Sequence, residues 1–550
     1  MCHYQGEHVE GGFMSTIEVP VLIVGGSLVG MSAATLLAQH GITSLAVEHH
    51  RGTAIHPRAA MATQRTMEVF RGIGLEASIR QRSAEQFVQD GGIVAVETLF
   101  GGLTKEFIAD LNAGVRDVSP SERLFLSQNA LEPLLKQRAL ELGANIRFAT
   151  EVTSVEEHRD GVTSTIRDRD TGEVTTVRSQ YLIAADGSHS RVRKQLGIAM
   201  RGHPTFSKSV TIYFRAPMRS ALHDKQWSVV YVNNDRLRGF FRFEKPFESA
   251  FLVVNTVGHP AQPVTDVSAD FSTERALEFV RIALGRDDVP IEIDNVMHWN
   301  AAAEVADKFQ TERIFIAGDA AHVMPPTGGF GGNTGVQDAH NLAWKLALVL
   351  KGRAPATLLA TYEDERRSAS SMTVEQAYTR YVLRTDPSIG TANAQKIVND
   401  LNIELGYVYR SAAIAQDGPD DGLPHLSPRE TCGRPGTRAP HLWLTNQGER
   451  VSSLDFYNRR FVLLGGPQSQ DWCQCGREIS AQTGIEIDVL RAGANGLEDE
   501  DGQLSAAHGI DPSGCVLIRP DGFVSWRART DEHASPQQLA AAVSQAIGRA

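Results

Sequence analysis

Residues 17–48 read IEVPVLIVGGSLVGMSAATLLAQHGITSLAVE, and this stretch decides the fold class. It opens on a continuous aliphatic run, Ile17–Val24, which predicts a strand buried on both faces of a parallel sheet. The run ends in glycines and is followed by apolar residues at helical spacing up to Gly41. A second short strand, Ile42–Val47, then closes at Glu48. This order of strand, glycine turn, helix and strand predicts a βαβ unit.

The glycine turn of this unit has the composition of a dinucleotide site. Gly25 allows a tight turn, Gly30 lets the helix approach the strand, and the helix N-terminus offers N–H groups to a pyrophosphate. Glu48 is placed to accept hydrogen bonds from ribose hydroxyls. Ser27 replaces the middle glycine of GxGxxG, which weakens the motif when it is taken alone. We predict cofactor contacts from Glu48 and from the turn residues Gly25, Gly26, Ser27, Leu28, Val29 and Gly30, with a turn that binds no ligand as the alternative.

Two later strands end in acidic turns. Residues 179–187 (SQYLIAADG) end at Asp186-Gly187, and residues 313–319 (RIFIAGD) end at Gly318-Asp319. The loop PPTGGFGGNTG then covers residues 325–335, and a helix is predicted over 336–350. So many glycines favour close approach of backbone to a flat ligand, with the helix dipole facing a partly anionic ring. An ordinary helix cap at Asp319 is the alternative.

Residues 200–300 contain four runs that alternate apolar and polar residues, which predicts an antiparallel sheet. The runs are 209–214, 227–232, 237–243 and 250–256. One face of such a sheet could line an apolar pocket for a planar aromatic compound. The aromatic candidates are Trp227, Tyr231, Phe241 and Phe243, each with plain sheet core as the alternative. Tyr231 and Arg242 are the polar candidates for a catalytic role.

Composition and charge exclude several classes of protein. The 550 residues suggest about three or four domains. The net charge of −11 argues against a nucleic-acid or anionic-membrane partner. No long apolar window and no signal-peptide pattern is present, so we expect a cytoplasmic protein. The five cysteines are too few for a disulfide framework, and Cys473 and Cys475 match neither a zinc site nor a redox CxxC. We predict unreactive thiols and no metal site.

The last third of the chain changes character twice. A helical pattern is predicted between Tyr378 and Leu423, and residues 417–440 form a linker rich in Pro, Gly and Asp. Short strands are predicted at 461–464, 485–490 and 516–518, followed by a final alanine-rich helix.

Together these motifs resemble the single-component FAD-dependent aromatic hydroxylases, also called group A flavoprotein monooxygenases. The resemblance covers residues 19 to about 370 and rests on VGGSLVG with Glu48, on Asp186-Gly187 and on GDAAHVMPPTGGFGGNTG. The stretches HPRAAMATQRTMEVFRGIGLE and SQNALEPLL add to it. It implies an α/β fold with a Rossmann-like FAD-binding domain, an antiparallel-sheet substrate domain and a thioredoxin-like C-terminal domain without CxxC. The expected boundaries are 15–195 and 301–423 for the two parts of the FAD-binding domain, 196–300 for the substrate domain and 424–550 for the C-terminal domain, with a segment at about 80–120 facing the substrate.

The resemblance also implies roles for individual residues. Asp319 would bind the ribityl chain of FAD, and Asp186 would lie near the pyrophosphate and support the use of NADPH. The backbone at Gly331, Gly332 and Asn333 would lie beside the isoalloxazine ring. Further cofactor contacts are expected from Arg58, Gln128, Val152 and Pro326, and Arg58 is also a catalytic candidate.

One position departs from the phenol-specific relatives. These carry an acid after the second strand that helps to deprotonate the phenol, whereas the position that aligns with it here holds Ala60. A substrate that ionises on its own, or a different base, is implied.

The implied reaction is the hydroxylation of an aromatic ring. NADPH, bound only transiently, reduces FAD; O2 then gives a flavin hydroperoxide, whose terminal OH passes to a ring carbon. The segment 213–258 looks most like bacterial enzymes that hydroxylate polycyclic aromatic polyketides in antibiotic biosynthesis. Hydroxylation of a simple phenol in catabolism, antibiotic inactivation and Baeyer–Villiger oxygenation remain alternatives, with a non-catalytic FAD-binding scaffold as a distant one. For the C-terminal domain we expect a structural or dimer-forming role, with a homodimer as the candidate assembly.

Overall fold

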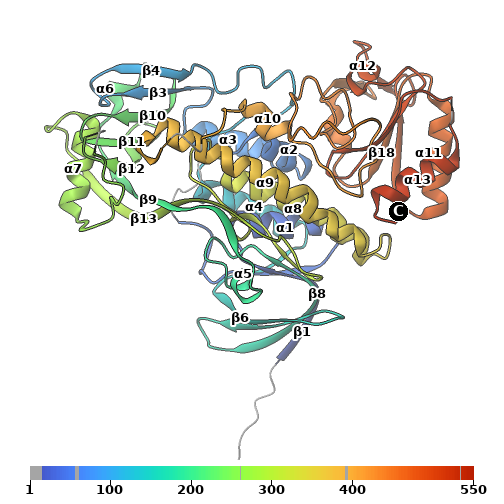
Figure 1. Ribbon diagram of the computed structural model, residues 1–550, viewed down its shortest axis with the longest axis horizontal. Helices are drawn as coiled ribbons and strands as arrows, with labels where there is room; N and C mark the ends of the chain where they lie inside the picture. The colour runs from blue at the N-terminus through green and yellow to red at the C-terminus, as the bar shows by residue number, and fades with distance from the viewer. Residues whose placement is uncertain (1–14, 56–60, 260–261, 391–393, 533, 550) are drawn as a thin grey trace, which may run out of the picture.

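The computed structural model describes residues 15–549 apart from 56–60, 260–261, 391–393 and 533. The chain forms three bodies (Figure 1). A mainly parallel sheet with its helices lies at the centre, an eight-stranded sheet lies at one end, and a smaller α/β body built by the C-terminal residues lies at the other. The long helix α9 (Thr357–Arg384) crosses the molecule between the two outer bodies.

The central seven-stranded sheet contains the predicted βαβ unit. β1 (Ser15–Val24) pairs in parallel with β2 (Ser44–Val47) and with β8 (Val174–Ala184), and α1 (Leu28–Gln39) connects β1 to β2. β14 (Ile314–Ile316) pairs in parallel with β8, on the edge of β8 that faces away from β1. The remaining strands are β5 (Asn145–Arg147), β6 (Thr150–Glu157) and β7 (Val162–Asp168). The carboxyl ends of β1, β8 and β14 therefore lie side by side, which brings three distant turns to one edge of the sheet.

The second sheet has eight strands in the order β15-β13-β9-β12-β11-β10-β3-β4. The four predicted runs are confirmed as strands β9 (Met200–Arg215), β10 (Trp227–Asn233), β11 (Leu237–Glu244) and β12 (Ser249–Val257). The sheet also takes in β3 (Gly92–Val96), β4 (Leu103–Ile108), β13 (Glu292–Ala306) and β15 (His322–Val323). β3 pairs in parallel with β10, so a segment from the first hundred residues is part of this sheet.

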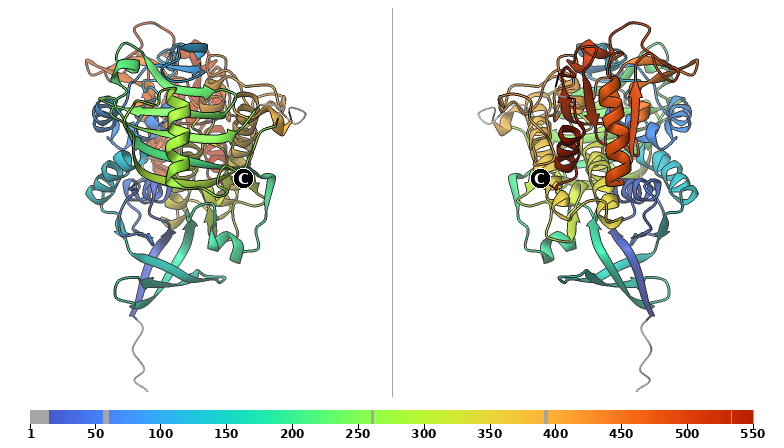
Figure 2. Two further views of the ribbon diagram at one scale, coloured as in Figure 1. Left: turned by 90° about the vertical axis from the view of Figure 1, so that its left-hand side faces the viewer. Right: turned by 90° about the vertical axis from the view of Figure 1, so that its right-hand side faces the viewer.

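The two faces of the second sheet have different surroundings. Helix α7 (Thr273–Leu284) lies across one face, as the left view of Figure 2 shows. Its buried residues Phe279, Val280 and Leu284 share an apolar core with Phe241 and Phe243. Tyr213, Phe251 and Val253 form a separate buried cluster from alternate positions of the same strands. Because the sequence predicts that one face of this sheet lines a substrate pocket, we call the face that carries this second cluster the substrate face.

The helices after residue 330 differ from the prediction in two places. α8 (Gly331–Leu350) begins five residues before the expected start at Val336, so the last glycines of the loop lie inside its first turns. Beyond α9, the only helical segments that the described part of 385–423 contains are a 3-10 turn (Pro387–Ile389) and α10 (Asp400–Leu405). The prediction of a helical pattern from Tyr378 to Leu423 is therefore wrong for most of that range.

The other helices are α2 (Gln64–Gly72), α3 (Glu76–Gln86), α4 (Gln128–Glu141), α5 (Arg191–Gln195) and α6 (Arg219–Leu222), with a 3-10 turn at Gly318–Ala320.

The C-terminal body has the strand order β19-β18-β21-β22. The predicted strands are confirmed as β18 (Phe461–Gly465), β19 (Ile487–Arg491) and β21 (Cys515–Ile518), and β22 (Val524–Ala528) completes the sheet. Helices α11 (Gln470–Thr483) and α13 (Pro536–Ala546) pack together on one face (Figure 2, right view). The smaller elements are β16 (Trp443–Asn446), β17 (Glu449–Ser452), a 3-10 turn (Ser453–Phe456), β20 (Leu497–Glu498) and α12 (Leu504–His508).

Two further predictions concern the cysteines and the membrane. Cys473, Cys475 and Cys515 are buried free thiols inside the C-terminal body. Among the described residues, none of the helices combines the length and the apolar character needed to cross a bilayer.

Candidate active site

Three turns from distant parts of the sequence meet at the carboxyl edge of the central sheet. The turn after β1 is joined to the turn after β8 by a hydrogen bond from Ala185 N to Val24 O (2.8 Å). The turn after β14 is joined to β8 by a bond from Ala317 N to Ala184 O (2.9 Å). Edges of this kind, outside the carboxyl ends of parallel strands, are where open α/β sheets bind their ligands.

The first turn leaves no room for side chains at its glycines. Gly25 has a φ of +105°, and a Cβ atom there would lie 2.2 Å from the carbonyl oxygen of Ala185. A Cβ atom at Gly30 would lie 1.8 Å from the carbonyl oxygen of Gly25, so helix α1 packs directly on the turn. A Cβ atom at Gly26 would lie 2.6 Å from the Cβ of Glu48. The N–H groups of Gly25, Gly26 and Leu28 donate to Val47, Glu48 and Glu132, so a pyrophosphate at the start of α1 would depend on the remaining N–H groups of the first helical turn.

Glu48 is almost fully buried at the end of β2. Its Oε2 accepts a hydrogen bond from Gly26 N (2.8 Å), and its Oε1 accepts one from His50 N (2.9 Å). The Glu48 carbonyl accepts a bond from Thr150 N at the start of β6, the strand that carries the half-buried Val152. Glu48 and Val152 therefore lie at the same end of the sheet, beside the first turn.

A second buried carboxylate, which belongs to α4, bonds this turn and was not predicted from the sequence. Glu132 of α4 accepts hydrogen bonds from Leu28 N (3.0 Å), from Ala54 N (2.6 Å) and from the hydroxyl of Ser27. The Nε2 of Gln128 donates to Glu132 Oε1 (2.7 Å) and to Ser27 Oγ (2.8 Å). The signal was present in SQNALEPLL, where Gln128 and Glu132 stand one helical turn apart on the same face.

The second and third turns are joined by a buried arginine. Arg193 of α5 donates to the carbonyl of Ser188 (3.1 Å) and to that of Ala320 (2.8 Å). Burial lowers the pKa of this guanidinium. Asp186 Oδ2 accepts from Arg191 N (2.9 Å), while its Oδ1 is buried without a hydrogen-bond partner among the described residues. An unpartnered buried carboxylate oxygen in this position suits a ligand that brings a hydroxyl group.

Asp319 is exposed at the tip of the third turn, and buried side chains hold this turn in place. Asp338 of α8 accepts hydrogen bonds from Gly318 N (3.0 Å), His322 Nε2 (2.7 Å) and Arg366 Nε (2.8 Å). Burial alone would raise the pKa of Asp338, but His322 and Arg366 lower it, so the carboxyl group stays ionised. The turn that presents Asp319 is therefore held by a charged group that the sequence motif did not reveal.

The first turn of α8 is fastened to the chain that precedes α2. Asn333 Nδ2 donates to the carbonyls of Met61 (2.9 Å) and Gly329 (2.7 Å), and its Oδ1 accepts from Thr63 N (2.9 Å). The N–H groups of the first turn of a helix have no intrahelical acceptor, which leaves those of the half-buried Gly331 and Gly332 for a ligand. The exposed Pro326 contributes its carbonyl to the loop, where it accepts from Gly329 N (2.9 Å). Arg58 and Ala60 lie outside the described residues, so their predicted roles stay predictions.

The substrate face presents Tyr231 and Arg242. Arg242 is buried, with its guanidinium carbon 3.9 Å from the ring centre of Phe125 and 4.8 Å from that of Phe87. Burial lowers the pKa of Arg242 to about 9, still high enough for a positive charge at neutral pH. The Tyr231 ring meets Phe107 edge-on at 5.7 Å between centres, and burial raises the pKa of its hydroxyl.

These side chains lie close to the start of α8. Phe125 and Phe87 form one apolar cluster that Met61 joins, and Met61 is the residue whose carbonyl Asn333 holds. Phe241, Phe243 and Trp227 pack instead with the α7 core, so these three aromatic candidates do not belong to the substrate face.

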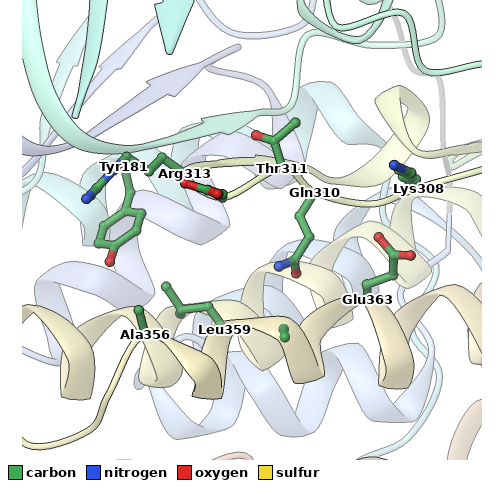
Figure 3. Close-up of a pocket in the computed structure, with 10 residues that line it drawn as sticks. Tyr181, Lys308, Gln310, Thr311, Arg313, Ala356, Leu359 and Glu363 are labelled. Carbon is green, nitrogen blue, oxygen red and sulfur yellow. The ribbon is translucent and has the colours of Figure 1, made fainter. Parts of the chain in front are cut away.

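A surface pocket of about 520 Å³ lies elsewhere, between residues 308–313 and α9 (Figure 3). Tyr181, Gln310 and Leu359 are among its lining residues. Residues 308–313 precede β14, whereas the three turns follow their strands. The pocket is therefore at the opposite end of the sheet and is separate from the site described above.

Three turns at the carboxyl edge of the central sheet, next to an aromatic sheet, are the arrangement that the sequence predicts for a flavin-dependent oxidoreductase. A family model for an FAD binding domain matches residues 18–377, and one for the C-terminal domain of aromatic-ring hydroxylases matches residues 432–550. The chain belongs to the family of FAD-dependent aromatic-ring hydroxylases, which confirms the resemblance, the fold class, the use of FAD and the assignment as a monooxygenase.

Relatives of known activity or structure support this assignment over almost the whole chain. The chain is 50% identical over 518 residues to a 4-methyl-5-nitrocatechol 5-monooxygenase from a Burkholderia species, covering 93% of this chain and 94% of that protein. It is 36% identical over 558 residues to a tetracenomycin A2 monooxygenase-dioxygenase of Streptomyces glaucescens, covering 98% of both. The solved structure of aklavinone-11 hydroxylase with FAD and aklavinone matches with a TM-score of 0.91 and 34% identity, over 98% of this chain and all of that one.

Proposed function

We propose that this monooxygenase hydroxylates an acidic phenol, bound as its anion on the substrate face, with NADPH as the reductant and O2 as the oxygen source. The observation that carries the proposal is Arg242, a buried cation between two aromatic rings on that face. A cation placed in this way favours a substrate with negative charge over a neutral one of the same shape.

Two further observations support an anionic phenol. The resemblance aligns Ala60 with an acid of phenol-specific relatives, and a substrate that ionises by itself would need no such acid. Electron-withdrawing groups such as nitro lower the pKa of a phenol, and the relative at 50% identity is named for a nitrocatechol. A polycyclic polyketide is the second candidate, because relatives across the same length of chain act on tetracenomycins and aklavinone.

The residues of this chain fit FAD and prepare the reaction around it. When bound, FAD supplies the two-electron redox chemistry and the activation of O2. The glycine turn at Gly25–Gly30, with Glu48 beside it, would hold the adenosine diphosphate part, and Asp319 would hold the ribityl chain. The start of α8 would offer its N–H groups and the positive end of its dipole to the isoalloxazine ring.

The substrate face has three tasks in this proposal. Phe87, Phe125 and Phe107 provide apolar surfaces that exclude water and limit the ring to one plane. Arg242 holds the charged oxygen of the substrate. Tyr231 keeps its own proton at neutral pH, because burial raises its pKa, and can donate a hydrogen bond to that oxygen.

The proposal is tested by substrate-stimulated NADPH oxidation. The purified holoenzyme is mixed with 4-methyl-5-nitrocatechol, catechol, 2,4-dichlorophenol or aklavinone, while H2O2 and product mass are followed under 18O2. Strong stimulation by the nitrocatechol, with one labelled oxygen in the product, is expected. Stimulation by aklavinone alone would favour the polyketide alternative, and a product with oxygen inserted into a carbon–carbon bond would favour Baeyer–Villiger oxygenation.

The role of Arg242 is tested by binding, independently of turnover. Substrate titration of the flavin absorbance should show that Arg242→Met weakens binding of the nitrocatechol by about tenfold or more, the size of one hydrogen bond to a charged group. Binding of catechol, which is neutral at pH 7, should change little. Equal losses for both compounds would show that Arg242 only supports the packing of the sheet.

A further inference from the structure

The C-terminal body is joined to the helices of the FAD-binding region by buried charged groups. Arg519, which follows β21, donates to both oxygens of Glu365 on α9, at 2.6 and 2.9 Å. Its Nε donates to Asp521 Oδ1 (3.0 Å). All three side chains are at most 2% exposed. This contact is therefore a desolvated part of the core rather than a surface ion pair.

The same carboxylate also binds α8. Glu365 Oε2 accepts from Lys345 Nζ (2.8 Å) and from Asn341 Nδ2 (2.7 Å). The C-terminal body, α9 and α8 thus meet at one buried carboxyl group. Each of these charges depends on the others, because an unpaired buried charge is far more costly than the pair itself is stabilising.

The next residue of α9 reaches the cofactor side of the site. Arg366 donates to Asp338 Oδ1 (2.8 Å) and to the carbonyl of Thr334 (3.2 Å), which lies in the first turn of α8. Asp338 in turn accepts the N–H of Gly318. Arg366 is therefore connected to the turn that presents Asp319 through a single group, the carboxylate of Asp338.

Arg366 has one more partner, and that partner is held by the C-terminal body. Its Nη1 donates to the hydroxyl oxygen of Tyr409 (3.0 Å). The Tyr409 ring stacks on Phe523 with 4.1 Å between ring centres, and Phe523 lies just before β22. Tyr409 N also donates to the carbonyl of Gly436 (2.7 Å). The position of Tyr409 is thus set by the C-terminal body at both its backbone and its ring.

We propose that Tyr409 is a positioning residue, through which the C-terminal body holds Arg366, Asp338 and the Gly318–Asp319 turn in the geometry that binds FAD. The C-terminal body, which lacks a CxxC motif, then contributes to the reaction by organising the cofactor site. Arg519 acts on the same helix through Glu365.

The test compares two tyrosines that lie in the same aromatic cluster. Tyr409→Phe keeps the stacked ring and deletes the hydroxyl that bonds Arg366. Tyr407→Phe is the matched control. The Tyr407 ring lies 5.3 Å from that of Tyr409 and 5.6 Å from the guanidinium carbon of Arg366, and Phe keeps both ring contacts. Among the described residues, the hydrogen bonds of the Arg366 side chain go to Asp338, Tyr409 and Thr334. Release of FAD from each holoenzyme is followed by flavin fluorescence on dilution, and thermal unfolding is measured on the same samples after FAD removal.

Tyr409→Phe should raise the dissociation constant of FAD about tenfold, as expected for one hydrogen bond to a charged group. Tyr407→Phe should change it less than about twofold, and the melting temperatures of the two FAD-free variants should agree. The visible absorption maximum of the bound flavin should also shift in Tyr409→Phe alone. Equal FAD affinity and spectra in both variants would overturn the proposal.

A second variant tests the link between the C-terminal body and FAD binding if Tyr409→Phe proves unstable. Arg519→Lys retains the charge. The three N–H groups of a lysine cannot replace all four bonds that Arg519 makes, two to Glu365 and two to Asp521. It should weaken FAD binding in the same direction while NADPH oxidation at saturating FAD stays near the native rate. An unchanged FAD affinity in Arg519→Lys would contradict a role of the C-terminal body in the cofactor site.

Discussion

Asn333 offers the sharpest test of how the cofactor site is assembled. The 4% exposed side chain makes three hydrogen bonds, to Met61 O, Gly329 O and Thr63 N, and so fastens the first turn of α8 to the chain before α2. Asn333→Ala leaves three backbone groups without these partners. At about 1 kcal/mol for each bond, the loss is about 3 kcal/mol. If this energy serves to arrange the site for FAD, the dissociation constant rises by about 100-fold.

The assay separates FAD binding from general stability. FAD release is measured by fluorescence, and the free energy of unfolding of the FAD-free protein by urea titration. Asn112→Ala is the matched control, because Asn112 is also buried and makes three side-chain bonds, to Asp90 and to the backbone of Arg123. It should lower the free energy of unfolding by a similar amount and leave FAD affinity nearly unchanged. A loss of stability in Asn333→Ala without a loss of FAD affinity would refute the reasoning.

Two further predictions concern close packing and acid stability. Gly30→Ala should abolish retention of FAD on gel filtration, since a Cβ atom 1.8 Å from the Gly25 carbonyl oxygen forces α1 away from the turn; a yellow, FAD-loaded variant would contradict this. Burial would raise the pKa of Glu68, but Arg438 and Arg65 lower it to about 2, below the usual glutamate value of 4.5. This carboxylate therefore stabilises the fold above pH 4.5 by up to about 3 kcal/mol, and that stabilisation is lost as the pH falls toward 2. Glu68→Gln should be less stable at pH 7, and its free energy of unfolding in urea should fall less steeply between pH 5 and pH 2; parallel pH profiles would disprove the assignment.

Local sequence was sufficient for the elements whose signals are contiguous. β1, α1 and β2 follow from an aliphatic run, a glycine turn and a helical period within about thirty residues. The start of α8 was missed because Gly331 and Gly332 have poor helix propensity. The bonds of Asn333 to Met61 and Thr63 outweigh that propensity, and these partners are about 270 residues away in the sequence.

The helical prediction after Tyr378 failed for a related reason. α9 ends at Arg384, shortly before Pro387, which disfavours helix in the residues that precede it. Beyond it, within the described residues up to Leu423, the helical spacing is realised only in the short helix α10, whose Leu401 and Leu405 pack against Val115 and Val118. The apolar pattern therefore reflects contacts of short segments, not one continuous helix.

The polar half of the site depends on pairs that no local pattern reveals. Glu132 bonds the Ser27 turn from 105 residues away, and Arg366 reaches Asp338 from the neighbouring helix. The strand β3 was missed in the same way, since its partner β10 lies far along the chain. Motifs therefore identified the three turns that meet at the sheet edge, whereas the charged groups that hold these turns in place emerged only with the fold.

The meeting of three distant turns also determines when the cofactor site can first exist during synthesis on the ribosome. β1 and α1 leave the ribosome early, but β1 gains β8 only after residue 184, and β8 gains β14 only after residue 316. Until β8 has been made, the apolar strand β1 has an unpaired edge, a condition that favours association with other chains. The nascent protein thus passes through a long interval in which the three turns cannot yet meet, and we expect protection of the β1 edge early in translation to raise its yield.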